Sequence, residues 1–200
     1  MLPIGFYTRA DVVQIAKELL GKVLVTRFDG LTTSGIIVET EAYAGAGDKA
    51  SHAYGGRRTA RTETMYRMGG VAYVYLCYGI HHLFNVVTNM EDIPHAVLIR
   101  AIEPIEGIDI MLERRGKSKL VPSLTAGPGA MSSALGIHTK HTGSRLSGGE
   151  IIIEDRGIVV KKKEIISGTR VGVAYAEEDA YLPYRFLIKD NPYVSKGKGQ

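Results

Sequence analysis

The sequence predicts an α+β fold: a single mixed domain with a curved, largely antiparallel sheet, few helices and a protruding β-hairpin. Strand-like segments outnumber helical ones, and the two kinds do not alternate as a doubly wound parallel sheet requires. Two apolar runs, 71–78 and 81–88, flank Gly79 in the pattern of a hairpin. Because 200 residues suit one domain with a substantial core, we expect 1–200 to fold as one unit with a frayed basic tail at 195–200.

The first element is expected to be a helix. Thr8 and Asp11 have the spacing of a capping box, and Gly21 is a typical C-terminal stop. Apolar residues recur between them at helical spacing, namely Val12, Ile15, Ala16 and Leu19.

Strands account for most of the other predicted elements. Two are expected at 22–27 and 35–43, around an Asp29-Gly30 turn, and a long polar segment at 44–70 follows. A loop of that length in a compact domain is usually functional or disordered. Further strands are expected at 95–102, 150–154, 157–161, 169–175 and 184–188. Pro104 is expected to open a helix that runs to Arg115, and a short helix at 130–135 follows a Gly-Pro-Gly turn.

Composition limits the function classes. No run of about 18 apolar residues is present, and the N-terminus lacks the pattern of a signal peptide, so we expect a cytoplasmic protein without a membrane partner, nucleoid-associated if bacterial. A lone cysteine, Cys77, excludes an internal disulfide. The net charge of +4 permits a polyanionic partner without requiring one. No exposed apolar helix face stands out, so we expect a monomer.

Paired acids mark the strand at 35–43. Alternation places Glu39, Glu41 and Tyr43 on one face. If that face is buried, the carboxylates need partners or altered pKa values, as in a catalytic site. The alternative is an edge strand whose acids face water.

Two segments could bind phosphate. The loop containing His52 carries Arg57, Arg58, Thr59 and Arg61 among glycines, residue types that suit phosphate oxygens. A solvated basic loop is the other interpretation. Gly127 and Gly129 precede a helix whose backbone N–H groups could hold a phosphate, although the proline between them removes one donor.

The hairpin suggests a base-binding device. Tyr73 and Tyr75 share one face of its first strand, and Tyr78 lies beside Gly79 at the tip. An aromatic side chain there suits a wedge that enters a base stack, or it packs on a neighbouring loop. In the return strand Asn85 is either structural or lines a pocket.

Arg100 stands at the end of the run AVLIR, within the strand expected at 95–102. It could clamp a phosphate or pair with Glu41 or Glu103. The six histidines show no metal-binding spacing, so we expect neither a metal nor a cofactor unless His81 and His95 meet across strands.

Together these segments resemble the alkyladenine (methylpurine) DNA glycosylase family over nearly the whole chain, from about Gly5 to Ser195. The resemblance rests on seven blocks in order: IVETEAY at 37–43, SHAYGGRRTAR at 51–61, YVYLCYGIHHLFNVV at 73–87, VLIRAIEP at 97–104, GPGAMSSALGI at 127–137, RVGVAYA at 170–176 and PYRFLIKDNPYVS at 183–195. It implies a monofunctional enzyme that flips a damaged purine from the minor groove side of double-stranded DNA and hydrolyses its glycosidic bond without a metal or cofactor.

The resemblance also implies residue roles. Glu41 matches the general base that activates water, and Arg100 matches a residue near that water and the phosphate backbone. The remaining matches are Tyr43, His52 and Tyr75 around the flipped base, Tyr78 as the intercalating residue, and Asn85 as the side chain that excludes guanine. Ala60, Ala130 and Tyr184 depart from the residues common in the family, which puts DNA affinity in question rather than the reaction.

Two other functions remain open from the sequence. One is a protein that binds flipped or damaged bases without turnover. The other is a carbohydrate hydrolase that uses Glu39 and Glu41, which neighbour each other on one strand face at about 6–7 Å.

Overall fold

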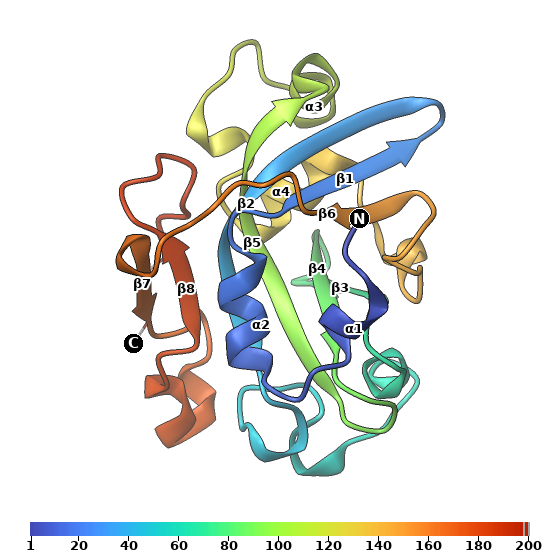
Figure 1. Ribbon diagram of the computed structural model, residues 1–200, viewed down its shortest axis with the longest axis vertical. Helices are drawn as coiled ribbons and strands as arrows, with labels where there is room; N and C mark the ends of the chain where they lie inside the picture. Colours follow the sequence, from blue (N-terminus) through green and yellow to red (C-terminus); the bar gives the residue numbers. More distant parts are fainter. Residues whose placement is uncertain (198, 200) are drawn as a thin grey trace.

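The computed structural model, which describes residues 1–197 and 199, contains one strongly curved antiparallel sheet (Figure 1). The strand order is β3-β4-β5-β2-β1-β6, and β8 pairs with both β2 and β7. The strands are β1 (Val23–Phe28), β2 (Leu31–Tyr43), β3 (Ala72–Cys77), β4 (His81–Thr88), β5 (His95–Glu106), β6 (Ile151–Glu154), β7 (Ile165–Gly168) and β8 (Arg185–Ile188). The predicted α+β class with a curved antiparallel sheet is confirmed.

β2 is the strand on which the sheet is organised. Along one edge it pairs with β1 near its start and with β8 at Glu39–Glu41, while β5 follows the other edge. Its register with β5 shifts between Ser34 and Gly35 and again between Ile37 and Thr40. Such irregularities bend a strand and redirect its side chains. β2 therefore bends where its two acidic residues lie.

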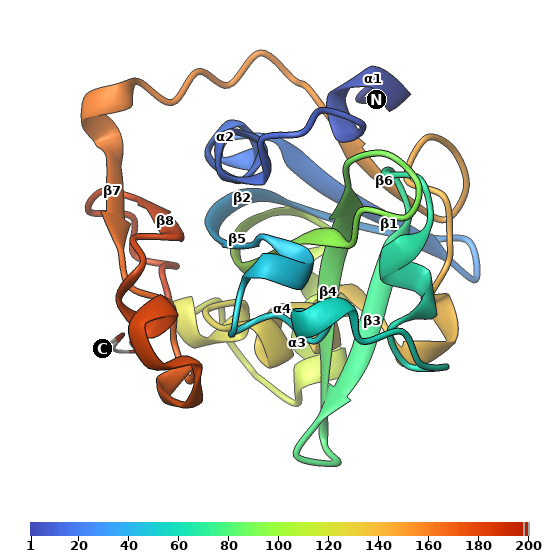
Figure 2. The ribbon, with the colours of Figure 1, turned by 90° about the horizontal axis from the view of Figure 1, so that it is seen from below.

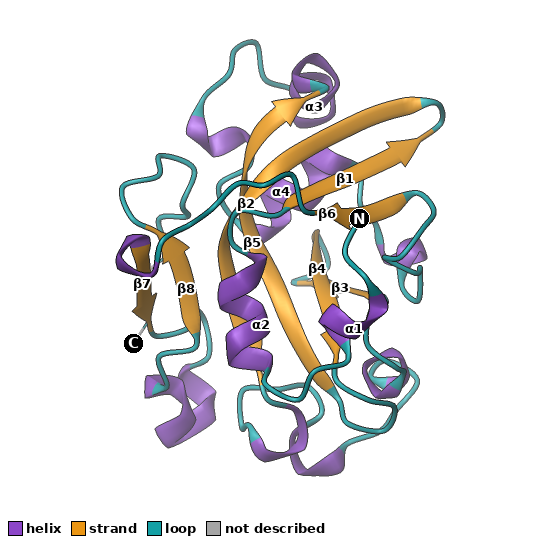
Figure 3. Ribbon diagram, viewed as in Figure 1, coloured by secondary structure: helices purple, strands orange, loops and turns teal. Residues whose placement is uncertain are grey.

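Short helices surround the sheet (Figure 3). The α-helices are α1 (Ile4–Tyr7), α2 (Val12–Leu19), α3 (Ile108–Arg115) and α4 (Pro128–Leu135). The 3-10 helices are η1 (Gly45–Gly47), η2 (Tyr54–Gly56), η3 (Glu63–Tyr66), η4 (Pro122–Leu124), η5 (Thr139–His141), η6 (Lys162–Glu164) and η7 (Ala174–Tyr181). α2 packs on β2 and β5, α4 packs on β4 and β5, and both contribute to the main core. No helix among the described residues is long and apolar enough to cross a membrane.

The first predicted helix exists, but its cap differs from the prediction. Asp11 is the N-cap, and its carboxylate accepts a hydrogen bond from Gln14 N at 2.9 Å. The prediction that Thr8 caps this helix is wrong, because Thr8 belongs to the end of the separate helix α1. The apolar stripe of α2 is buried as predicted.

Pro104 does not open a helix. It lies within β5, opposite Gly35 of β2, and α3 begins only after Gly107. β4 pairs with β5 only from His95 to Leu98, and an isolated bridge from Ala101 to Ala126 follows on the same edge. Beyond that bridge the edge is free, so a missing N–H at Pro104 costs little. That free edge explains why proline is compatible with the strand.

The last third contains fewer strands than predicted. Residues 157–161 form an extended connector without strand pairing, and 169–175 lead into η7. The strand β7 was not predicted, because only four residues pair and their side chains are mostly exposed. Alternation in 169–175 is not sufficient for a strand, because Val171, Val173 and Tyr175 alternate there without strand pairing.

Candidate active site

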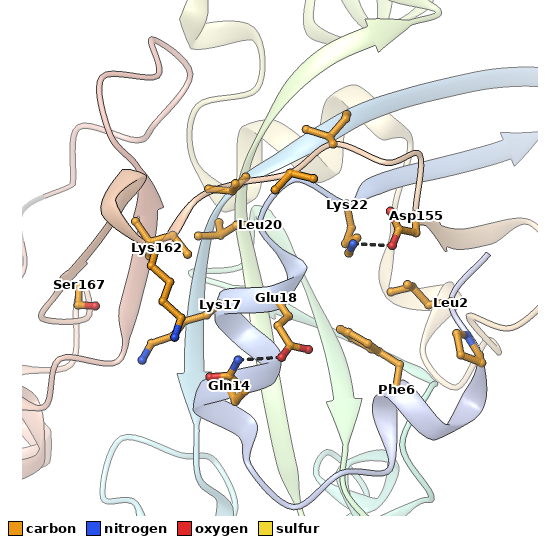
Figure 4. A pocket seen from close by; sticks show the side chains of 15 residues that line it. Leu2, Phe6, Gln14, Lys17, Glu18, Leu20, Lys22, Asp155, Lys162 and Ser167 are labelled. Carbon is orange, nitrogen blue, oxygen red and sulfur yellow. Dashed lines mark hydrogen bonds and ion pairs between the residues drawn. The ribbon is translucent and has the colours of Figure 1, made fainter.

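Two cavities lie on different sides of β2. The larger, about 800 Å³, lies between α2 and the connector after β6 (Figure 4). The smaller, about 40 Å³, is a slot lined by Tyr43, Ala50, Ser51, His52, Met65, Tyr73, Tyr75, Asn85, Ala96 and Tyr175. Thr40 donates to Ala16 O of α2 at 2.9 Å, so alternation directs Glu41 away from α2. Glu41 thus lies on the side of the smaller cavity.

Glu41 is completely buried beside the slot. Its Oε2 accepts a hydrogen bond from Tyr43 Oη at 2.9 Å, and its Oε1 accepts one from Val171 N at 2.8 Å. Arg100 Nη1 lies 3.2 Å from the same Oε1. Since a carboxylate has about four acceptor positions, these three donors leave one position of Glu41 unfilled.

Glu39 is also completely buried, but its acceptor positions are filled. Its Oε1 accepts from Arg100 Nε at 2.8 Å, Arg185 Nε at 2.8 Å and Ser195 Oγ at 2.9 Å. Its Oε2 accepts from Ser195 N at 2.7 Å. Arg100 therefore bridges the two carboxylates, so both acids face the same buried cation as their spacing predicts. The alternative of an edge strand with acids in water is wrong.

Ser195 belongs to the end that the sequence predicts to be a frayed tail, 195–200. Instead of fraying, it is held by Glu39, and Gly197 O accepts from Arg185 Nη1 at 2.8 Å. Residues 198 and 200 lie outside the described residues.

Tyr43 joins Glu41 to the slot. Burial raises the pKa of the Tyr43 phenol well above its usual value, and the Glu41 charge adds to this, so the phenol stays protonated as a donor. The Arg170 guanidinium lies 4.9 Å from the centre of the Tyr43 ring and 5.3 Å from that of Tyr184. A cation at this distance attracts the ring face and fixes its position.

The buried ion pair of Arg170 with Asp48 anchors the loop at 44–70. Both guanidinium Nη atoms donate to the Asp48 carboxylate, and Nη1 also donates to Ala42 O at 3.0 Å. Asp48 in turn accepts from Ala44 N at 2.9 Å and Ala50 N at 3.0 Å. The pair thereby joins the end of β2 to the loop that carries one wall of the slot.

Aromatic rings form the other wall. His52 Nδ1 is 2.9 Å from Tyr73 Oη, and its ring meets the Tyr75 ring edge-on at 4.6 Å between centroids. Burial lowers the pKa of His52 to about 4, and the charges of Arg61 and Arg57 reinforce this, so His52 is neutral near pH 7. The sequence-predicted residues Tyr43, His52, Tyr73 and Tyr75 therefore lie together.

The slot is too small for a purine in this conformation. A cavity of about 40 Å³ accommodates roughly one water molecule, whose share of liquid volume is about 30 Å³. It adjoins a wider basin of about 610 Å³, with which it shares Ser51, His52 and Tyr175. A planar base entering from the basin would have to move the rings apart.

Asn85 lines the slot from β4. Its side-chain amide donates to Tyr73 O at 3.1 Å and Leu83 O at 3.2 Å, which fixes its orientation. Both interpretations of Asn85 therefore hold, because it is hydrogen-bonded structurally and also borders the slot.

The basic loop provides fewer free cations than its sequence suggests. Arg58 is paired with Glu63 at 2.8 Å and Asp92 at 2.6 Å. Arg57 borders the wider basin, and the Arg61 guanidinium lies 5.2 Å from the centre of the Tyr75 ring. Thr59 N donates to Thr62 Oγ1 at 2.9 Å, which is a turn contact. Arg57 and Arg61 thus lie at the mouth of the slot.

The hairpin ends in an exposed apolar tip that projects from the body of the molecule (Figure 2). Tyr78 is 91% exposed, and Ile80 beside it is 71% exposed. Tyr78 and Gly79 have φ values of 51° and 74°, as a type I′ turn requires. A left-handed conformation is unfavourable for a tyrosine. Because the Tyr78 side chain is almost fully exposed, the interpretation that it packs on a neighbouring loop is wrong.

The two glycines before α4 have different reasons to be glycine. Gly127 has a φ of 114°, which other residues rarely adopt. At Gly129 a Cβ atom would lie 2.9 Å from the His81 ring, so this glycine allows α4 to approach the hairpin. Close packing of α4 against His81 is thus a reason for glycine at position 129, in addition to the predicted phosphate contact.

His81 and His95 do not meet. His81 pairs with Cys77 at the tip end of β4, whereas His95 pairs with Thr88 at its other end. Among residues 1–197 and 199, no group of three or more His, Cys, Asp or Glu side chains is arranged to hold a metal ion.

Sequence reasoning missed several residues of the site: Asp48, Arg170, Val171, Tyr175, Arg185 and Ser195. All lie far from β2 in sequence or within the polar loop, so strand periodicity could not associate them with Glu41. Arg170 begins the block RVGVAYA, where an arginine at the start of a largely apolar run is a usable signal in the sequence.

Comparison with known proteins places these residues in a family context. A family model described as "Methylpurine-DNA glycosylase (MPG)" matches residues 5–192. A protein of Chlamydia abortus is 52% identical over 94% of this chain and 98% of its own length. Relatives from Chlamydia felis and Clostridium perfringens are 50% and 47% identical, over 94% and 96% of this chain and 96% and 97% of their own lengths. All three carry the name "Putative 3-methyladenine DNA glycosylase".

Proposed function

Since the chain belongs to the methylpurine-DNA glycosylase family and is a hydrolase of N-glycosidic bonds in base excision repair, we propose that it flips an alkylated or deaminated purine into the aromatic slot and releases it with water activated by Glu41. The observation that carries the proposal is the position of Glu41. Its carboxylate is buried beside the slot and bonded to Tyr43, whose ring lines that slot.

The aromatic walls suit an electron-poor base. Alkylation at N3 or N7 makes a purine cationic, and a cation gains about 1–2 kcal/mol from desolvated aromatic faces. Neutral His52 adds no opposing charge near pH 7. A damaged base also costs less to unpair than a normal one. The slot therefore selects partly by charge and partly by fit, and its ring contacts open to admit the base.

Glu41 acts on the developing sugar cation and on the attacking water. Departure of the purine leaves an oxocarbenium-like sugar, which a neighbouring carboxylate stabilises electrostatically. The remaining acceptor position of Glu41 takes a proton from water as that water attacks C1′. Arg100, 3.2 Å from Glu41, keeps the carboxylate oriented. The described residues lining the slot include no lysine, which supports water rather than an amine as the nucleophile.

The hairpin tip supports insertion into the DNA. We assign Tyr78 the role of the wedge that fills the space left by the flipped nucleotide from the minor groove. Its exposure and left-handed backbone support this role, because an exposed apolar side chain in an unfavourable conformation has no folding benefit. Arg57 and Arg61 at the mouth of the slot are positioned for flanking phosphates, and one copy of the chain carries all these groups.

A carbohydrate hydrolase using both acids is disfavoured by Glu39. A glycosidase of that kind needs two carboxyl groups that reach the substrate. Glu39 is buried and receives four hydrogen bonds, so it has no acceptor position for a sugar. The non-catalytic alternative is disfavoured by the acceptor position that remains on Glu41.

A single-turnover incubation tests the proposed reaction. Excess enzyme is mixed with a labelled duplex that carries one 3-methyladenine analogue, hypoxanthine or 1,N6-ethenoadenine, and alkali then cleaves abasic sites. We expect strand cleavage only after alkali, at the lesion. Stable binding of the lesion duplexes without release of any base over hours would instead favour the binding-only function.

A further inference from the structure

Ser195 and Gly197 lie against the buried charges of the site. Ser195 donates twice to Glu39, through its backbone N at 2.7 Å and through Oγ at 2.9 Å. Arg185 donates to Gly197 O at 2.8 Å and to Ser195 O at 3.3 Å. Ser195 and Gly197 therefore contact the buried ion cluster of Glu39, Arg100 and Arg185.

Glu39 connects Ser195 to Arg100 through hydrogen bonds to both residues. The Nε of Arg100 is bound to Glu39 Oε1 at 2.8 Å, and its Nη2 lies 3.4 Å from Ser195 Oγ. With those two groups held, Nη1 is directed at Glu41. A guanidinium is planar and rigid, so fixing two of its nitrogens fixes the third. The direction of the Arg100–Glu41 contact thus depends on residues that are themselves bound to the chain end.

The same segment borders the second donor to Glu41. A Cβ atom at Gly197 would lie 3.1 Å from Val171 Cγ1 and 3.3 Å from Arg100 Nη2. Val171 N donates to Glu41 Oε1 at 2.8 Å. Gly197 therefore packs beside the side chains of Val171 and Arg100, the two residues that contact Glu41 Oε1.

We propose that Ser195 and Gly197 are positioning residues of the active site, which hold Arg100 and Val171 against Glu41 through Glu39, Arg185 and direct packing. The proposal rests on the proposed function of Glu41 as the base. It means that the geometry around Glu41 is complete only when Ser195 and Gly197 are docked, and that these two residues influence the rate of bond cleavage.

Point variants in the full chain test the proposal. Ser195→Ala removes the Oγ contacts with Glu39 and Arg100 but keeps the backbone contact, and Gly197→Ala pushes on Val171 and Arg100. Loss of a hydrogen bond of about 1 kcal/mol corresponds to roughly a fivefold rate change. We expect both variants to lower the single-turnover rate by about three- to tenfold while the Kd for lesion DNA is unchanged. Lys196→Ala, an exposed position between them, is the matched control and should behave as the wild type.

A double-mutant cycle separates positioning from general destabilisation. If Ser195 acts through Arg100, the rate effects of Ser195→Ala and Arg100→Lys should be less than additive, because either one alone disturbs the same contact. Fully additive effects, or a rate loss that simply follows the loss in unfolding free energy, would overturn the proposal.

Amide exchange of Ser195 provides a readout that needs no turnover. We expect slow exchange in the wild type and fast exchange in Glu39→Gln, because the amide donates to Glu39. Fast exchange in the wild type would overturn the anchoring, and wild-type rates in both Ser195→Ala and Gly197→Ala would overturn the positioning role. If the wild type shows slow exchange at Ser195 but cleaves no lesion, the proposed function of Glu41 as the base is contradicted and the anchoring of Ser195 is not.

Discussion

The two cavities beside β2 differ in the kind of charge that surrounds them. The larger one is bordered by surface pairs such as Lys22–Asp155 at 2.7 Å, in which the Asp155 side chain is 50% exposed. Behind Tyr43, which lines the aromatic slot, lie Glu41 and the Asp48–Arg170 pair, whose side chains are buried. The larger cavity has about twenty times the volume, at 800 Å³ against 40 Å³.

This difference indicates what marks a reactive site. Volume alone would select the cavity beside α2 as the active site. The charged pair at its border is partly exposed to solvent and therefore weakly coupled. Buried charges have to be paired, and their pairing fixes the neighbouring side chains in one geometry. The slot combines such pairs with ring faces and a carboxylate that can still accept a proton. The predictions below compare matched changes at the two cavities.

The largest expected effect on stability is at the buried pair. Asp48→Asn leaves the Arg170 charge buried without its partner, so we expect the free energy of unfolding to fall by about 3–5 kcal/mol. Asp155→Asn breaks the exposed pair at the larger cavity, and the expected loss is under about 1 kcal/mol. Urea denaturation of both variants makes the comparison. Equal losses would show that the two pairs are energetically alike.

Tyr78→Asn should weaken base flipping without lowering the free energy of unfolding. Asparagine favours the left-handed conformation that Tyr78 adopts, so we expect unfolding stability to be unchanged or to rise by up to about 1 kcal/mol. Base flipping should weaken because the wedge is lost, as measured by the fluorescence of a base analogue at the lesion. Val159→Asn, at a 79% exposed apolar residue beside the larger cavity, should leave flipping unchanged. Normal flipping by Tyr78→Asn would contradict the wedge.

His52 should make the slot sensitive to acid. Its pKa falls from 6.5 to about 4 on folding, so between these values the unfolded chain binds the extra proton. The contribution of this group to stability is therefore fully present above about pH 6.5 and is lost as the pH falls toward 4, by on the order of 3 kcal/mol. His52→Gln should remove this part of the pH dependence in unfolding experiments between pH 4.5 and 7. An identical pH dependence in both proteins would show that His52 does not titrate abnormally.

The smallest effect is expected at the larger cavity. The Lys17 ammonium lies 5.1 Å from the centre of the Phe186 ring, a contact worth about 0.5–1 kcal/mol at an exposed site. Lys17→Ala should therefore lower stability slightly and leave the single-turnover rate within about twofold of the wild type. A large loss of cleavage would mean that this cavity takes part in the reaction.

Sequence reasoning succeeded where a local period or a turn carries the information. The α2 stripe, the hairpin with Tyr78 at its tip, and the shared face of Glu39 and Glu41 all follow from spacings within one element. It failed at Pro104, where the free edge of β5 depends on how far β4 extends. It could not separate the roles of the two acids, because neighbours from distant parts of the chain decide which one keeps a free acceptor position.

Glu41→Gln, compared with the wild type on one lesion duplex, tests the central claim most directly. Glutamine keeps the size of the side chain but cannot take a proton from water, and general base catalysis contributes about 10²- to 10⁴-fold. We expect the single-turnover rate to fall by at least about 10³-fold, since the electrostatic stabilisation of the sugar is lost as well. Binding of the lesion duplex should be retained. A cleavage rate close to that of the wild type would contradict the assignment of Glu41 as the base.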